Sequence, residues 1–138
     1  MITMVLNDQQ IKMHLQKAKT IAVIGFSKDE SKTAYKIPHY LTEHYTVFPV
    51  NPTADEIDGL KCYKSITDIS EHIDIVDVFR PGSQCGEIMK EIISLKNKPN
   101  LVWLQLRITN DEAKKLALEY NIDFIEDKCI YVERERLL

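Results

Sequence analysis

The chain has few cysteines, and they cannot be paired among themselves. Cys62, Cys85 and Cys129 are the three cysteines of the 138-residue sequence, widely spaced and without a C-x-x-C pair. A disulfide framework and a structural zinc site both need cysteines in pairs at short characteristic spacings. We therefore expect three reduced thiols and no metal site.

Long hydrophobic runs and an excess of positive charge are also missing. No apolar run approaches the roughly 20 residues that cross a bilayer. The apolar start, Met1 to Leu6, lacks the basic segment and the cleavage site of a secretion signal. The formal net charge is −3, and no RNP, zinc-finger or lysine-run signature is present. We expect a cytoplasmic protein with no membrane segment and no nucleic-acid partner.

Glycine is scarce where a dinucleotide-binding protein needs it most. Four apolar residues, 21–24, run into Gly25, like the strand that opens a nucleotide-binding βαβ unit. The fingerprint G-x-G-x-x-G would require glycine at Ser27 and Glu30, and its ribose-binding acid would stand at Asn51. Two of the three glycines and the acid are absent, which disfavours NAD.

Strand and helix patterns alternate along the chain. Apolar runs predict strands, and apolar residues at helical spacing predict the crossovers between them. The strands are expected at 20–25, 46–50, 74–79, 101–104 and 123–125, and the helices at 36–44, 83–95 and 110–120, after an N-terminal packing helix within 1–19. Helix-length crossovers predict a parallel sheet. We therefore expect a single α/β domain over 1–138, doubly wound, with a mainly parallel five-stranded sheet and helices on both faces.

Three segments fit this pattern less regularly. Between 51 and 73 we expect a turn at Asp58-Gly59 and a short helix in "SITDISEH". Pro38 is expected near the start of its helix, which would then begin near Lys36. The C-terminal "VERERLL" alternates charge, and two interpretations stay open, an extension of the sheet edge and the cover of a homodimer seam.

Cations follow four of the five predicted strands although the chain is net acidic. Ligands of open α/β sheets bind beyond the carboxyl ends of the strands, where helix N-termini also favour anions. The residues at these ends are Gly25, Phe26, Ser27 and Lys28 after the first strand, Asn51 and Pro52 after the second, Arg80 after the third, Gln105 and Arg107 after the fourth, and Lys128 after the fifth. This edge of the sheet is predicted to bind phosphate.

Five stretches carry a resemblance to a known family. In order and spacing, "TIAVIGFSKDE", "KIPHYLTEHYTVFPVNP", "DIVDVFRP", "VWLQL" and "DKCIYVE" resemble the small stand-alone CoA-binding domain proteins of bacteria and archaea. That family is similar to the CoA-binding module of the succinyl-CoA synthetase alpha subunit. The resemblance covers roughly residues 18–133 and implies a Rossmann-like fold that binds coenzyme A at its strand ends.

The resemblance also implies roles for particular residues. Asn51 and Pro52 would border the adenosine end of CoA, and Phe79 and Arg80 would line the middle of the site. The pyrophosphate would be cradled by the first loop with Lys32, that is by Gly25, Phe26, Ser27, Lys28 and Lys32.

On the two remaining strand ends, Trp103, Gln105, Lys128 and Cys129 match family positions beside the site. Where relatives usually have glycine after "WLQL", this chain has Arg107, which would either meet a CoA phosphate or occlude the pocket.

No residue is predicted to be catalytic. The four histidines, at 14, 39, 44 and 72, form no metal-binding i, i+4 pair. Cys129 beside Lys128 is read either as a nucleophile or as a buried small hydrophobe. We expect a non-enzymatic protein that binds coenzyme A or an acyl-CoA, for sensing or regulation. Two alternatives stay open, an NAD(H)-binding module or small oxidoreductase of the same fold class, and an accessory subunit without a ligand.

Overall fold

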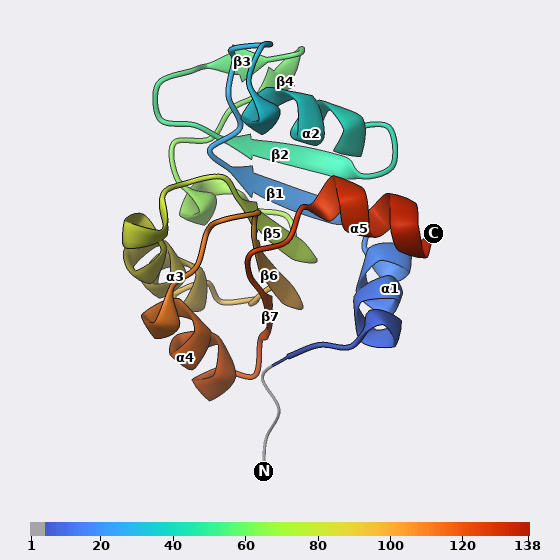
Figure 1. Ribbon diagram of the computed structural model, residues 1–138. Helices are drawn as coiled ribbons and strands as arrows, with labels where there is room; N and C mark the ends of the chain where they lie inside the picture. The colour runs from blue at the N-terminus through green and yellow to red at the C-terminus, as the bar shows by residue number, and fades with distance from the viewer. Residues whose placement is uncertain (1–4) are drawn as a thin grey trace.

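A computed structural model describes residues 5–138, so the first four residues of the predicted N-terminal segment lie outside the described part. Five parallel strands form one sheet in the order β2-β1-β5-β6-β7 (Figure 1). The strands are β1 Thr20–Ile24, β2 Thr46–Val50, β5 Ile75–Val78, β6 Leu101–Leu104 and β7 Asp123–Ile125. The predicted doubly wound α/β fold with a five-stranded parallel sheet is confirmed.

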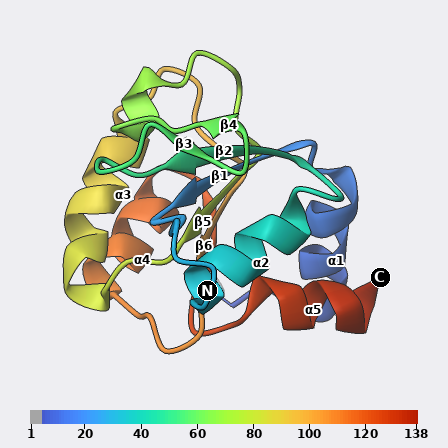
Figure 2. The ribbon, with the colours of Figure 1, turned by 90° about the horizontal axis from the view of Figure 1, so that it is seen from above.

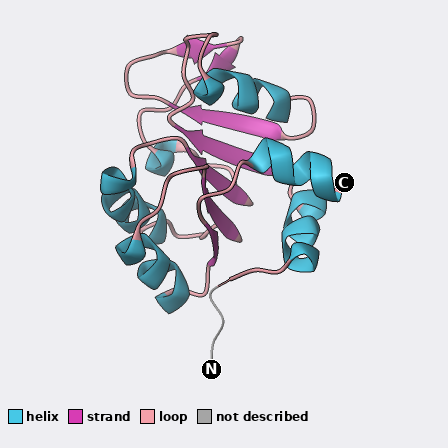
Figure 3. Ribbon diagram, viewed as in Figure 1, coloured by secondary structure: helices cyan, strands magenta, loops and turns pink. Residues whose placement is uncertain are grey.

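Helices cover both faces of the sheet, as Figures 2 and 3 show. One face carries α3 and α4, and the other carries α1, α2 and α5. Their bounds are α1 Asp8–Lys17, α2 Thr33–Leu41, α3 Cys85–Ile93, α4 Asp111–Glu119 and α5 Ile130–Leu137. A short 3-10 turn, η2 Gly82–Gln84, leads into α3, so the helix predicted over 83–95 begins with a tighter turn.

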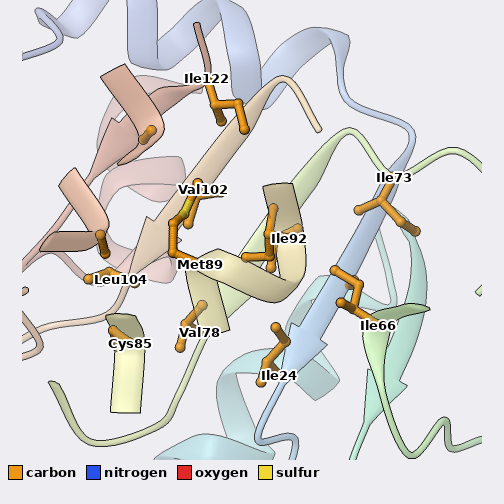
Figure 4. Close-up of a cluster of buried hydrophobic side chains, with 14 of the residues drawn as sticks. Ile24, Ile66, Ile73, Val78, Cys85, Met89, Ile92, Val102, Leu104 and Ile122 are labelled. Carbon is orange, nitrogen blue, oxygen red and sulfur yellow. The ribbon is translucent and has the colours of Figure 1, made fainter. Parts of the chain in front are cut away.

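The strands divide their side chains between two cores because alternate residues point to opposite faces. Val102 and Leu104 pack toward Met89 and Ile92 of α3 (Figure 4). On the other face, Trp103 lies in a second cluster with residues of α1, α2 and α5. Its indole N–H donates a hydrogen bond of 2.8 Å to the Lys128 carbonyl, which satisfies the buried donor.

The strand order determines where a ligand fits. From β1 the chain crosses to β2 on one side, and from β5 it crosses to β6 on the other. The connections therefore diverge at the carboxyl ends of β1 and β5, which pair in register from Ile21 with Ile75 to Ile24 with Val78. Such a switch point leaves a crevice above the sheet, and this is where open α/β sheets bind ligands.

The predicted position of Pro38 within its helix is wrong. The helix starts at Thr33 rather than near Lys36, so Pro38 lies in the middle of α2. Proline has no backbone N–H, and the carbonyl four residues earlier, that of Ala34, loses its usual helical partner. The Ala34 carbonyl instead accepts a hydrogen bond of 3.0 Å from the N–H of Ser27.

The irregular segment between β2 and β5 contains a small hairpin that the sequence analysis did not predict. Strands β3 Glu56–Ile57 and β4 Leu60–Lys61 pair antiparallel around the expected Asp58-Gly59 turn. The Asp58 carboxylate accepts from the Tyr35 hydroxyl at 2.7 Å and lies 2.8 Å from Nδ1 of His39, which holds the hairpin against α2. The short helix expected in "SITDISEH" is the 3-10 turn η1 Ile66–Asp68.

The C-terminal residues form a helix, so the sheet-edge interpretation of "VERERLL" is wrong. Helix α5 buries Ile130 and packs against α1 and α2. Arg136 donates two hydrogen bonds of 2.8 Å to the Asp8 carboxylate, which joins the two ends of the described chain. The homodimer seam stays a prediction. Within residues 5–138, the helices are too short or too polar to cross a membrane.

Candidate functional site

A cavity of about 560 Å³ opens at the carboxyl ends of β1, β2 and β5. It lies at the switch point of the sheet, and its volume falls in the range of roughly 300–1,000 Å³ that small-molecule sites occupy. The structure brings seven of the predicted site residues together on its wall, namely Gly25, Ser27, Lys32, Asn51, Pro52, Phe79 and Arg80.

Gly25 allows the carboxyl end of β1 to lie close to the carboxyl end of β5. Its φ is +92°, which L side chains rarely adopt, and its N–H donates to the Val50 carbonyl at 2.9 Å. A Cβ atom at this position would come within 2.8 Å of the Phe79 carbonyl oxygen and 3.0 Å of Cδ of Arg80. Only glycine therefore fits without displacing the backbone that forms this wall of the cavity.

The N-terminus of α2 is open toward an anion. Lys32 is the N-cap of the helix, and its side chain makes no capping hydrogen bond. Lys32 and Ala34 both line the cavity. The first N–H groups of a helix have no partner within it, and together with the helix dipole they favour a phosphate.

Asn51 connects two loops of the site. Its Nδ2 donates to the Phe26 carbonyl at 2.8 Å, and its Oδ1 accepts from the N–H of Thr53 at 2.9 Å and from its hydroxyl at 2.8 Å. The amide thus holds the loops after β1 and β2 in place. A ribose-binding acid would occupy this position in a dinucleotide-binding protein.

Two basic side chains of the cavity are held by neighbouring groups. Nε of Arg80 donates to Oε1 of Gln84 at 3.1 Å. Nζ of Lys64 donates to the Pro52 carbonyl at 3.1 Å and lies 3.4 Å from Oδ1 of Asp55. Both keep donors for a ligand, because a guanidinium carries five N–H groups and an ammonium three. With Lys32, these residues give the cavity a basic wall.

The other five predicted residues lie outside the lining of this cavity. Phe26 is fully buried because its ring packs into the core beneath α2. Gln105 is also buried, and its Oε1 accepts from the N–H of Ile130 at 3.2 Å. Lys28, Arg107 and Lys128 are exposed on loops.

Arg107 adopts a left-handed backbone conformation, with φ of +68°. Its N–H donates to Oδ1 of Asp127 at 2.7 Å, which fixes the turn after β6. Glycine meets no steric penalty in this conformation, so the backbone here would suit the glycine that the resemblance implies for this position.

Sequence reasoning missed several residues of the lining. They lie on loops, on the 3-10 turns or on α3, and they are Thr53, Lys64, Ser65, Ile66, Gln84, Ile88 and Glu91. None belongs to a short motif. Lys64 alone offered a signal in the sequence, because a cation just before a short helical turn could have indicated an anion-binding position.

Two aspartates at and near β5 have different surroundings. The Asp74 carboxylate, just before the strand, accepts hydrogen bonds from the N–H groups of Lys19 at 2.7 Å and Thr20 at 3.2 Å. Asp77 is fully buried between the register partners Val23 and Trp103, and its carboxyl oxygens have no partner among the described residues. Desolvation raises the pKa of Asp77 well above its usual value.

The three cysteines are free, as expected, and none lines the cavity. Burial raises the pKa of the Cys85 thiol to about 11. Cys129 is half-buried and is the N-cap residue of α5. The described wall of the cavity therefore contains no thiol that could act as a nucleophile.

A second cavity, of about 420 Å³, lies at the opposite edge of the sheet, between α1 and the amino ends of β5 and β7. Nε2 of His14, on its wall, lies 2.7 Å from the Asp123 carboxylate. The cations at the strand ends are on the other side of the sheet, so the first cavity is the candidate site.

Solved structures of several related proteins share this fold. A protein from Thermus thermophilus matches with a TM-score of 0.90 and 41% identity, covering 96% of this chain and 100% of the other. A hypothetical protein from Pyrococcus horikoshii OT3 matches with a TM-score of 0.90 and 36% identity, covering 96% of this chain and 92% of the other.

Sequence relatives fall into two sizes. The uncharacterized protein YneT of Bacillus subtilis is 36% identical over 124 residues, which span 89% of this chain and 90% of that protein. An ADP-forming acetate–CoA ligase of Methanocaldococcus jannaschii is 30% identical over 131 residues, so the match spans 89% of this chain but 18% of the ligase. The model of the CoA-binding domain family matches residues 19–135. The chain thus belongs to the CoA-binding domain family.

Proposed function

We propose that this chain is a cytoplasmic protein that binds coenzyme A or an acyl-CoA without catalysing a reaction, and that it serves in sensing or regulation. The observation that carries the proposal is the cavity at the β1/β5 switch point. There the uncapped N-terminus of α2 meets the side chains of Lys32, Lys64 and Arg80.

The charges of this cavity match the charges of coenzyme A. The cofactor carries a pyrophosphate and a 3′-phosphate, and charge-assisted hydrogen bonds from lysine, arginine and helix N–H groups bind such anions. An acid beside the ribose would repel the 3′-phosphate, whereas NAD needs one for its free diol. The amide of Asn51 at this position favours CoA over NAD.

Relatives support the same ligand. The Methanocaldococcus relative is named an acetate–CoA ligase, and this chain corresponds to 18% of its length. We propose that this chain corresponds to the CoA-binding part of that ligase.

Calorimetric titration of the purified protein with CoA, acetyl-CoA, NADH and ADP tests the proposal, after native mass spectrometry has identified any ligand that copurifies. We expect saturable binding of CoA and acetyl-CoA, weaker binding of ADP, which lacks the 3′-phosphate, and the weakest binding of NADH. Equal binding of NADH and CoA would favour the dinucleotide alternative. No heat and no thermal shift with any of the four would favour an accessory subunit without a ligand.

A further inference from the structure

One carboxylate stands in the otherwise basic cavity of the candidate site. Glu91 lines the cavity together with Lys32, Lys64 and Arg80, and it belongs to α3, whereas Lys32 caps α2. A ligand with several phosphates would not bring an anion to Glu91, because like charges repel. A neutral hydrogen-bond donor of the ligand can approach Glu91 without this repulsion.

The Glu91 carboxylate is held in place with one oxygen left for a ligand. The Ser65 hydroxyl donates to Oε1 of Glu91, and this connects η1 to α3. The same Ser65 oxygen accepts from the N–H of Thr67 at 3.1 Å, so its orientation is fixed by the turn. Oε2 of Glu91 has no partner among residues 5–138 and remains available as an acceptor.

Two aliphatic side chains of the cavity come from the same two elements as Ser65 and Glu91. Ile66 directly follows Ser65, and Ile88 precedes Glu91 by three residues on the same face of α3. Both isoleucines line the cavity. A flat, apolar ring with an N–H donor on its edge suits such a subsite better than a flexible, fully solvated chain does.

We infer that this end of the cavity receives the adenine base of the ligand and that Glu91 accepts a hydrogen bond from the 6-amino group. The inference rests on the proposed function, because it assigns one part of the CoA molecule to one part of that site. Glu91 and Ser65 therefore act as specificity determinants, distinguishing a 6-amino purine from a 6-oxo purine, whose oxygen would face the carboxylate.

The test compares CoA with its hypoxanthine analogue, in which an oxygen replaces the 6-amino group. The two ligands have the same phosphates, so the ratio of their dissociation constants cancels any general effect of charge at position 91. A hydrogen bond to a charged group changes affinity by a factor of about 10 to 100. We expect the wild type to favour CoA by at least that lower factor.

In the Glu91→Ala variant this preference should collapse toward equal affinity for the two ligands. Glu91→Gln keeps the volume of the side chain and should give an intermediate ratio. Glu87→Ala is the matched control, since Glu87 lies on the same helix, pairs with Lys90 and does not line the cavity. The control should keep the wild-type ratio.

The outcomes separate the two proposals. A wild type that binds CoA and its analogue equally, or a Glu91→Ala variant that keeps the full preference, overturns this inference and leaves CoA binding intact. A wild type that binds neither ligand overturns the proposed function, and the assignment of Glu91 with it.

Discussion

The backbone N–H of Ser27 donates a hydrogen bond of 3.0 Å to the carbonyl oxygen of Ala34. This contact exists because Pro38, four residues after Ala34, has no N–H with which to occupy that carbonyl. Pro38 thus leaves the Ala34 carbonyl free to bind the loop after β1 at the start of α2. In this way a single proline affects the geometry of the proposed phosphate site.

Pro38→Ala tests this connection. The new N–H would compete for the Ala34 carbonyl, so we expect faster amide hydrogen exchange at Ser27 and weaker CoA binding, while α2 itself becomes more stable. The N–H of Gly25, which donates to Val50, is the internal reference and should keep its protection. Unchanged exchange at Ser27 would contradict the assignment.

Gly25→Ala should damage both stability and the site. A left-handed backbone costs an L residue about 1–2 kcal/mol, and the new Cβ would also lie 2.8 Å from the Phe79 carbonyl oxygen. We expect a loss of at least that size in the free energy of unfolding, measured by urea denaturation, together with weaker CoA binding.

Gly59→Ala is the control for that experiment. Gly59 also has a positive φ, of +77°, but its Cβ would meet no atom within 4 Å. The Gly59→Ala variant should therefore lose only the free energy of unfolding that the left-handed backbone costs, and it should bind CoA as tightly as the wild type. Equal losses of affinity in the two variants would mean that the close approach of Gly25 to Phe79 does not shape the site.

Asp77→Asn should change how stability depends on pH. The pKa of Asp77 is raised in the folded state, so the folded protein keeps a proton that the unfolded chain releases above its ordinary pKa. The contribution of Asp77 to the free energy of unfolding is therefore complete below the pKa that Asp77 has in the unfolded chain. It is lost as the pH rises toward and through the pKa that Asp77 has in the folded protein. In that window the wild type should lose up to about 1.4 kcal/mol per pH unit relative to the variant.

Urea denaturation of both proteins between pH 5 and pH 8 measures this difference. The free energy of unfolding of the variant should increase relative to that of the wild type as the pH rises. Asp74→Asn is an unsuitable substitute, since Asp74 accepts hydrogen bonds from the backbone of Lys19 and Thr20. Parallel stability curves for the wild type and Asp77→Asn would show that Asp77 is ionised in the folded protein.

Arg107→Gly should stabilise the protein. The residue has a φ of +68°, and glycine removes the strain at some cost in the entropy of the unfolded chain. We expect a net gain of about 0.5–1 kcal/mol in the free energy of unfolding. Arg107→Ala removes the same side-chain charge but keeps the strain, so it should show no gain. A loss of stability in the glycine variant would show that the arginine side chain contributes more than its backbone costs.

Much of the fold follows from local patterns in the sequence. The strands at 46–50, 101–104 and 123–125 have the predicted bounds, because buried apolar runs end abruptly at polar residues. The hairpin around Asp58-Gly59 escaped prediction because strands of two residues are too short to show a period. The charges of the C-terminal segment hid a helix whose buried face depends mainly on Ile130 and Glu133.

The site was predictable only in part. The rule for strand ends located Gly25, Asn51 and Arg80 on the cavity wall, because sheet topology alone brings them together. It could not determine that the Phe26 ring turns into the core. Glu91 could not be predicted from the sequence, because an exposed glutamate on a helix becomes part of a cavity only when α3 packs beside η1.

Calorimetric titration of CoA into the wild type, Arg80→Ala and Arg107→Gly tests the central claim most directly. Both variants remove one arginine at a strand end, but only Arg80 lines the cavity. We predict saturable binding by the wild type, an affinity lowered by about tenfold or more in Arg80→Ala, and wild-type affinity in Arg107→Gly. Absence of CoA binding, or binding that depends on Arg107 and is indifferent to Arg80, would contradict the account.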